Sequence, residues 1–222
     1  MSDSFWCDPA QLTRDLLKFC FSDDSHGYGR HITRYAYYHY LGKFISAHPR
    51  HFASIKSVLD VSGSLELLKL VGHADLFEVE SVRPPQVYFP DSGLASSSYN
   101  LVVCDQVLEH IKGSPWDVAV EFHRLLQSGG LVMLTTCFAM PLHPTPSDYL
   151  RFSQESLHEI FSSAGFDVLE CSGWGNRLVW FICEQGFRWN NVPRNPANPI
   201  NQIALQREDG FDIITWIIAR KR

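Results

Sequence analysis

The residues whose types and spacing could do chemistry begin with Asp60 and Glu80. Asp60 closes a short apolar run, and a small-residue turn follows it at Ser62-Gly63-Ser64. Glu80 lies about 20 positions after Asp60, the offset at which an acid hydrogen-bonds two ribose hydroxyls in nucleotide-binding units. A carboxylate suits this role because it accepts two O–H donors at once. The spacing predicts a nucleotide-like ligand, and a solvated glutamate at a strand end is the alternative.

The segment after this turn has the pattern of an amphipathic helix. Leu65, Leu68 and Leu70 recur at helical spacing around Glu66 and Lys69, which predicts a strand, a turn and a helix in succession. Backbone N–H groups at the start of such a helix have no intrahelical partner and can hold a polar ligand. The alternative is a buried strand and helix joined by a serine turn, with no ligand.

Histidines supply the candidate proton acceptors, because the imidazole titrates close to neutral pH. The candidates are His110, His143 and either His31 or His39. His143 lies in a proline-rich loop after an apolar strand, at the sheet edge where ligands bind. His110 ends the run Val-Leu-Glu-His, a position more typical of a hydrogen-bonded structural histidine.

Three further side chains are candidates for substrate contacts. Tyr149 and Arg151 follow His143 closely, and the guanidinium of Arg151 could pair a substrate carboxylate or phosphate. A structural ion pair between Arg151 and Asp148 is the alternative. Trp174 follows a later strand at the same edge, where it walls the pocket or merely precedes a helix.

Composition and charge restrict the class of protein. The 222 residues, 45% of them hydrophobic, suit one domain with a sizeable core. The net charge of −5 argues against a nucleic-acid or membrane-surface partner held by charge alone, and no apolar run is long enough to cross a bilayer. The six cysteines form no Cys-x-x-Cys pair. We therefore expect reduced thiols, no metal site, no secretion signal and a cytoplasmic location.

Alternating strand and helix patterns predict an α/β fold with a doubly wound, seven-stranded, mostly parallel sheet. The expected strands are 58–61, 75–80, 86–89, 99–104, 131–136, 168–171 and 211–219. The expected helices are 9–21, 30–46, 65–71, 116–126, 153–164 and 176–186, and a long loop follows the last of them to residue 210. Residues 1–50 are expected to form an N-terminal helical cap, and residues 51–222 the α/β domain.

The second helix of the expected cap is unusually rich in aromatic rings. It contains Tyr35, Tyr38 and His39 among others. Amphipathic rings of this kind predict a lid that lines a small-molecule pocket. The alternative is that the rings simply pack the cap onto the sheet.

Three segments together resemble the class I S-adenosylmethionine-dependent methyltransferases. They are Val58-Leu-Asp-Val61, Tyr99-Asn-Leu-Val-Val-Cys-Asp-Gln-Val-Leu-Glu-His110 and Glu121-Phe-His-Arg-Leu-Leu-Gln-Ser-Gly-Gly-Leu131. The segments His143–Phe152 and Ala164–Phe166 are similar to the region after the fifth strand in small-molecule members. The resemblance implies a Rossmann-like methyltransferase fold, S-adenosylmethionine as cofactor and a small-molecule methyl acceptor.

The resemblance also implies roles for individual residues. Asp60 and the turn at Ser62-Gly63-Ser64 would border the methionine end of the cofactor, and Glu80 would hold the ribose. Asp91 matches the acid that receives the adenine amino group. Cys104 and Asp105 would face the methionine portion and the substrate.

The chain departs from the family at the turn. Where the family has Gly-x-Gly-x-Gly, this sequence has Ser62, Ser64 and Glu66 at the glycine positions. Two serines are small enough for the turn, whereas Glu66 would add bulk and negative charge near the cofactor carboxylate. The two acids further along, Glu80 and Asp91, favour retained cofactor binding.

The resemblance and the candidate residues predict a methyltransferase that acts on an oxygen or nitrogen of a small molecule. The strand end Cys104-Asp-Gln-Val disfavours a nucleic-acid amino methyltransferase, and the lost glycines disfavour a dinucleotide dehydrogenase. Two alternatives stay open: a non-catalytic methyltransferase-like scaffold, and an enzyme that uses the same fold for another reaction. The sequence leaves the oligomeric state open, a dimer included.

Overall fold

The computed structural model describes residues 8–222, apart from residues 62, 64, 84–88 and 90. The chain divides into two compact units: residues up to Tyr37 together with Gly175–Phe211, and Tyr38–Trp174 together with Asp212–Arg222. None of the described helices is both long and apolar enough to span a bilayer.

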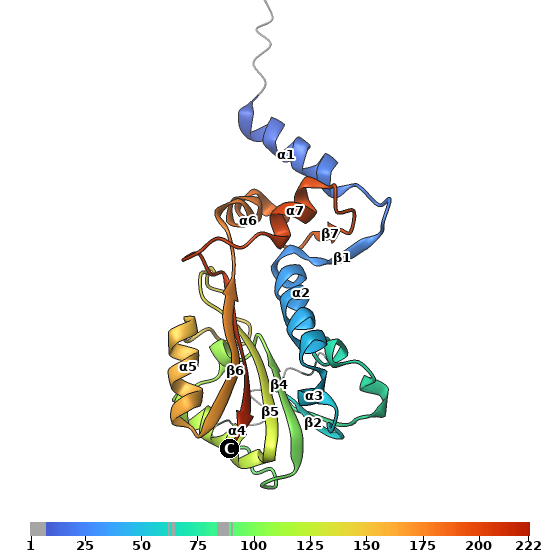
Figure 1. Ribbon diagram of the computed structural model, residues 1–222. Coiled ribbons are helices and arrows are strands. Elements are labelled where there is room, and N and C mark those ends of the chain that lie inside the picture. Colours follow the sequence, from blue (N-terminus) through green and yellow to red (C-terminus); the bar gives the residue numbers. More distant parts are fainter. Residues whose placement is uncertain (1–7, 62, 64, 84–88, 90) are drawn as a thin grey trace, which may run out of the picture. The chain divides into compact units, whose positions relative to one another are not determined.

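The second unit contains a six-stranded sheet among the described residues, in the order β3-β2-β4-β5-β8-β6 (Figure 1). Its strands are β2 (Ser57–Asp60), β3 (Glu78–Ser81), β4 (Tyr99–Asp105), β5 (Leu126–Cys137), β6 (Phe166–Trp174) and β8 (Ile214–Lys221). The first four in this order are parallel, and β8 is antiparallel to β5 and β6. The predicted mostly parallel α/β sheet is confirmed. The seventh expected strand, 86–89, falls outside the described residues except for Phe89.

The central strand β4 is buried on both faces. Its sequence YNLVVCD is nearly continuous in apolar residues, as expected for a parallel strand that is covered on both sides. It pairs with β2 on one side and with β5 on the other. Asp105 ends the strand opposite Thr135 of β5, so the carboxyl ends of these two strands lie side by side.

Helices α4 (Pro115–Leu125) and α5 (Gln154–Ser163) cover one face of the sheet. Each begins at a serine cap: Ser114 accepts from the N–H of Asp117, and Ser153 from the N–H of Ser156. Both helices were predicted, and their apolar stripes explain their packing. The core on this face includes Val118, Phe122, Leu157 and Phe161 of the helices and Val102, Val132 and Ile217 of the strands.

Helix α2 (Ile32–Ala47) packs on the opposite face through its residues from Tyr38 onward. The ring of Tyr40 stacks on Trp216 of β8 with 6.2 Å between centroids, on the side opposite to Ile217. The Tyr38 hydroxyl donates to Oδ2 of Asp105 at 2.6 Å. The short helix α3 (Pro49–Phe52) follows and leads into β2.

The first unit combines the N-terminal segment with residues Gly175–Phe211. Helix α1 (Pro9–Phe21) is followed by β1 (Tyr28–His31), which is antiparallel to β7 (Asn191–Pro193). Helix α6 (Arg177–Ile182), a π turn at Cys183–Phe187 and helix α7 (Pro199–Leu205) complete the unit. The proposed cap of residues 1–50 stays a prediction. The structure groups its first part with residues 175–211 because β1 pairs with β7.

Three predicted elements differ from the structure. The expected α-helix at 65–71 is wrong: Leu65 has a positive φ of 54°, which no helix accepts, and only 3₁₀ turns form, at Leu68–Val71 and Ala74–Leu76. The expected long loop to residue 210 contains β7 and α7, where Asn198 caps the helix by accepting from the N–H of Ile200. Residues 28–31 are a strand because they hydrogen-bond to β7.

We predict that Tyr38→Phe lowers the free energy of unfolding by about 1.5–3 kcal/mol, the scale of a hydrogen bond to a charged group. The variant removes one donor from the buried Asp105, which is 2% exposed. Urea denaturation measures the change. Tyr149→Phe is the control, since the Tyr149 side chain is 48% exposed, and equal losses in both variants would contradict the prediction.

Candidate functional site

The candidate site residues gather where β2, β4 and β5 end. In a parallel sheet these carboxyl ends share one edge, and ligands of open α/β sheets bind there. Asp60 ends β2, Asp105 ends β4 and Thr136 lies at the end of β5. His110 and His143 follow β4 and β5, whereas Glu80 lies in β3 and Asp91 in the loop after β3.

Two basic side chains, Arg83 and Lys69, lie at or near the turn after β2. Gly63 has a φ of 65° and its carbonyl accepts from Nη2 of Arg83 at 2.8 Å. The backbone angle favours glycine, and a Cβ here would lie 2.2 Å from Nε of Arg83, whose exposed side chain would have to move. Glu66 pairs with Lys69 at 2.8 Å, which balances the charge expected to repel a cofactor carboxylate. Ser62 and Ser64 lie outside the described residues.

Asp60 and Glu80 occupy neighbouring strands but differ in exposure. Asp60 has no exposed surface, and its Oδ2 accepts from the hydroxyl of Ser81 at 3.3 Å. Glu80 is exposed, and its Oε2 accepts from the hydroxyl of Tyr99. Burial raises the pKa of Tyr99, and the hydrogen bond to Glu80 raises it further. Tyr99 therefore orients a carboxylate that solvent and ligands can reach.

Asp91 lies in a loop that is tied to helix α4. Its neighbour Ser92 donates through both its N–H and its hydroxyl to Oε1 of Glu121. Glu121 also receives two hydrogen bonds of 2.7 Å from Arg124. Asp91 itself is exposed, so the loop is anchored while the Asp91 side chain faces solvent.

Cys104 and Asp105 are both buried at the end of β4. Cys104 has no exposed surface and packs in the core under α4 and α5. Burial raises the pKa of its thiol well above the usual value, and nearby carboxylates add to this, so Cys104 is no nucleophile at neutral pH. The carboxylate of Asp105 receives hydrogen bonds of 2.6 Å from Tyr38 and from Thr135. Asp105 therefore has a structural role at the site.

The structure brings His110 and His143 together on Glu109. The nitrogen atoms Nε2 of His143 and His110 lie 3.9 and 4.0 Å from Oε1 of Glu109, and the two rings meet edge to face at 4.9 Å. Glu109 has no exposed surface, and its Oε2 accepts from the hydroxyl of Thr136 at 2.8 Å. The carboxylate of Glu109 raises the pKa of His143.

The other ring nitrogens of the two histidines face backbone carbonyls. Nδ1 of His110 contacts the carbonyl of Ser147. Nδ1 of His143 lies 3.1 Å from the carbonyl of Pro141 and 3.3 Å from Oδ2 of Asp148. These contacts favour the tautomers that carry the proton on Nδ1 and leave both Nε2 atoms as acceptors.

Arg151 forms the structural ion pair that was one of its two predicted roles. Its guanidinium binds both carboxylate oxygens of Asp148, which holds the pKa of Asp148 well below its usual range. It also donates to the carbonyls of Met140, Pro141 and Leu150. The guanidinium thus closes the loop after β5, and its proposed contact to substrate stays a prediction.

The remaining candidates have different surroundings. Tyr35 and His31 belong to the first unit, where the Tyr35 hydroxyl accepts from Asn201 at 3.0 Å. Tyr38 is bound to Asp105, while His39 is exposed. Trp174 has no exposed surface, which fits core packing better than a pocket wall.

Solved structures show which fold this is; no protein-family model and no curated protein matches the chain. A SAM dependent methyltransferase from Archaeoglobus fulgidus aligns with a TM-score of 0.50 and 14% identity, over 83% of this chain and 94% of that one. The chain has the class I methyltransferase fold. The 1,6-didemethyltoxoflavin-N1-methyltransferase of Burkholderia thailandensis, solved with that compound and S-adenosylhomocysteine, aligns with a TM-score of 0.51 and 16% identity, over 99% of this chain and 93% of that one.

Within this methyltransferase fold, two residues of the histidine cluster, Glu109 and Thr136, were not among the predicted site residues, and Asp148 was predicted only as the ion-pair partner of Arg151. Glu109 joins the two imidazoles, Thr136 holds its other oxygen, and Asp148 accepts from the backbone N–H of His143 at 2.9 Å. Glu109 stands directly before His110 in the run Val-Leu-Glu-His, and that adjacency was the available signal. Its burial could not be inferred from the run itself.

We predict that Asp148→Ala loosens the loop after β5. Removal of a carboxylate that is 1% exposed leaves Arg151 and the N–H of His143 without this partner. Amide exchange over residues 140–151 should accelerate by about tenfold or more, since one charged hydrogen bond contributes about 1.5–3 kcal/mol.

Asp167→Ala is the matched control, because Asp167 is 48% exposed and pairs only at the surface with Arg222 and Arg220. Mass-spectrometric hydrogen exchange measures both variants. Unchanged protection of residues 140–151 in Asp148→Ala would show that the ion pair does not hold the loop.

Proposed function

We propose that this chain is an S-adenosylmethionine-dependent methyltransferase that acts on an oxygen or nitrogen of a small molecule. One observation carries the proposal: in a class I methyltransferase fold, an exposed carboxylate, Glu80, is held by Tyr99 at the end of β3 beside β2. The Burkholderia thailandensis protein with this fold was solved with S-adenosylhomocysteine. That finding supports the same cofactor here.

The cofactor would lie across the carboxyl ends of β2, β3 and β4. Glu80 would accept from the ribose hydroxyls and Asp91 from the adenine amino group. The backbone at Asp60 and Gly63 would border the methionine end. Cys104 and Asp105 would support this edge from beneath, since both are buried.

The charge balance at the turn supports retained binding of a zwitterionic methionine group. Glu66 is paired with Lys69, and the guanidinium of Arg83 lies against Gly63. A cofactor carboxylate would meet the Arg83 cation there, which offsets the loss of the glycines at positions 62, 64 and 66.

Methyl transfer requires positioning and removal of a proton. The acceptor atom attacks the methyl carbon in line, the carbon–sulfur bond breaks, and the sulfonium becomes a neutral thioether. We propose His143 and His110 as the groups that take the acceptor's proton, because their Nε2 atoms share one buried carboxylate. His39, Tyr149 and Arg151 remain proposed substrate contacts. The predicted contacts of Tyr38 and Trp174 are less favoured, because Tyr38 binds the buried Asp105 and Trp174 has no exposed surface, and Tyr35 belongs to the first unit.

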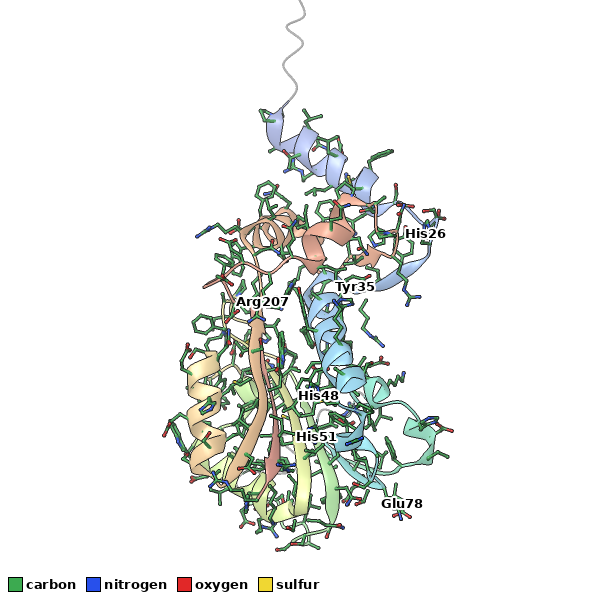
Figure 2. All side chains as sticks on the ribbon, viewed as in Figure 1. His26, Tyr35, His48, His51, Glu78 and Arg207 are labelled. Carbon is green, nitrogen blue, oxygen red and sulfur yellow. The ribbon has the colours of Figure 1, made fainter. Side chains whose placement is uncertain are left out.

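We predict that the protein binds S-adenosylmethionine and S-adenosylhomocysteine, and that Glu80→Gln weakens both by about tenfold or more, because a neutral amide is a poorer acceptor. Glu78→Gln is the matched control. It lies on the same strand at the amino end, and Figure 2 shows its side chain pointing away from the sheet. Isothermal titration calorimetry measures all three proteins.

If millimolar S-adenosylmethionine produces no heat of binding, the methyltransferase proposal is wrong and a non-catalytic scaffold is favoured. If the parent chain binds the cofactor and both Glu80→Gln and Glu78→Gln lose affinity equally, the cofactor does not lie at the end of β3.

We also predict that Asp91→Ala weakens cofactor binding by at least ~1 kcal/mol, the scale of one hydrogen bond to a carboxylate. Asp75→Ala, another exposed aspartate, should leave the affinity unchanged. The same calorimetric titration applies. If Asp91→Ala binds as tightly as the parent chain, the adenine amino group lies elsewhere.

A further inference from the structure

We propose that Glu109, His110 and His143 form a binding site for one divalent transition-metal ion. The ligand atoms would be Oε1 of Glu109 and Nε2 of each histidine. One candidate ligand atom of each residue lies within 4.8 Å of those of the other two, and Nε2 of His143 and of His110 lies 3.9 and 4.0 Å from Oε1 of Glu109. Among the described residues, no other group of His, Cys, Asp and Glu side chains meets as closely.

The buried carboxylate of Glu109 is incompletely hydrogen-bonded. Glu109 has no exposed surface, and one of its oxygens is bound by Thr136. In the described part of the chain, no donor lies within hydrogen-bond distance of the other oxygen, Oε1. A buried polar atom without a partner costs about 1–3 kcal/mol, more for a charged group. A cation at Oε1 would remove that cost.

The two imidazoles are oriented as metal ligands would be. Metal-bound histidines usually donate the other ring N–H to a carbonyl or carboxylate, which fixes the tautomer. Here Nδ1 of His110 contacts the carbonyl of Ser147, and Nδ1 of His143 contacts that of Pro141. Both Nε2 atoms are thereby directed to the same point beside Glu109.

The donor set selects the kind of ion. Two imidazole nitrogens and one carboxylate suit Zn²⁺ and other first-row divalent ions, whereas Mg²⁺ and Ca²⁺ prefer oxygen ligands. Three protein ligands leave at least one coordination position open, as in catalytic rather than structural zinc sites. The side chains of His110 and His143 are 11% and 27% exposed, so a small molecule can approach from their side.

The distances require only a small contraction. Bonds of about 2.0–2.1 Å in a tetrahedral site place two ligand atoms about 3.4 Å apart. The Glu109 oxygen lies 3.9 Å and 4.0 Å from the two nitrogens, so each of these two pairs must close by about half an ångström. The candidate nitrogen atoms of the two histidines lie within 4.8 Å of each other and must close to the same separation. His143, on a loop and partly exposed, can move by this amount.

A role for the ion rests on the proposed methyltransferase function. An acceptor hydroxyl bound at the open position would lose its proton to water more readily, because the cation lowers its pKa. The resulting alkoxide or phenolate would attack the methyl carbon. With the ion bound, the two histidines act as ligands, and their role as proton acceptors applies to the metal-free protein.

Direct metal titration tests the site without any methyl acceptor. The full chain is treated with a chelator, dialysed and titrated calorimetrically with zinc chloride, and cobalt(II) absorption reports the coordination geometry. We expect one Zn²⁺ per chain and a tetrahedral cobalt spectrum. His143→Ala should lower the affinity by about 100-fold or more, because loss of an outer-shell partner alone costs up to about 100-fold, and His110→Ala should do the same.

His26→Ala is the matched control, because His26 lies in the exposed loop between α1 and β1, labelled in Figure 2. Glu109→Gln keeps an acceptor for Thr136 and removes the charge, so it should fold and lose zinc affinity. Circular dichroism checks folding of each variant. If Glu109→Gln does not fold, His143→Ala alone decides, since that side chain is partly exposed.

Absence of stoichiometric binding, or equal binding by the parent chain, His143→Ala and His110→Ala, would overturn the metal site. S-adenosylmethionine binding measured in the presence of chelator separates the two proposals. If the cofactor binds and zinc does not, only the metal site fails. If zinc binds and the cofactor does not, the methyltransferase proposal fails and the metal site stands.

Discussion

The sheet of this protein depends on hydrogen bonds to three carboxylates that are buried where its central strands end. Asp60, Asp105 and Glu109 stand at or just beyond the ends of β2 and β4 and are at most 2% exposed. Buried carboxylates are costly unless they are hydrogen-bonded or paired. The structure meets this constraint with hydroxyl donors from other elements, namely Tyr38, Ser81, Thr135 and Thr136. These bonds tie α2, β3 and β5 to the central strands.

The carboxylates differ in how completely they are hydrogen-bonded, and this difference distinguishes structural residues from candidate ligand-binding residues. Asp105 receives a hydroxyl on each of its oxygens and anchors α2. Glu109 receives a hydroxyl on one oxygen, and the other faces two imidazoles. The same distinction applies to Arg151, which is enclosed by Asp148 and carbonyls, and to Glu80, which Tyr99 orients while it stays exposed. The carboxylates that can still accept a hydrogen bond or a cation are the ones suited to bind ligands.

Much of the fold was predictable because its signals are local. The continuous apolar run of β4 and the serine-capped stripes of α4 and α5 predict their elements without reference to the rest of the chain. One error arose where a distant contact decided the conformation, and another where the local backbone departs from a helix. Residues 28–31 became a strand by pairing with β7. The leucines at 65–70 had helical spacing, yet the positive φ of Leu65 prevents an α-helix there.

The sequence by itself determined most strands and helices of the sheet, the methyltransferase-like motifs and the two histidines as candidates, because residue type and spacing carry this information. Only the tertiary structure decided how those side chains are used. It buried Cys104 and Trp174, paired Arg151 with Asp148, and brought His143 from the loop after β5 onto Glu109 and His110 after β4. The physical reason is that burial and donor geometry depend on which strand ends become neighbours, and that neighbourhood exists only once the sheet has formed.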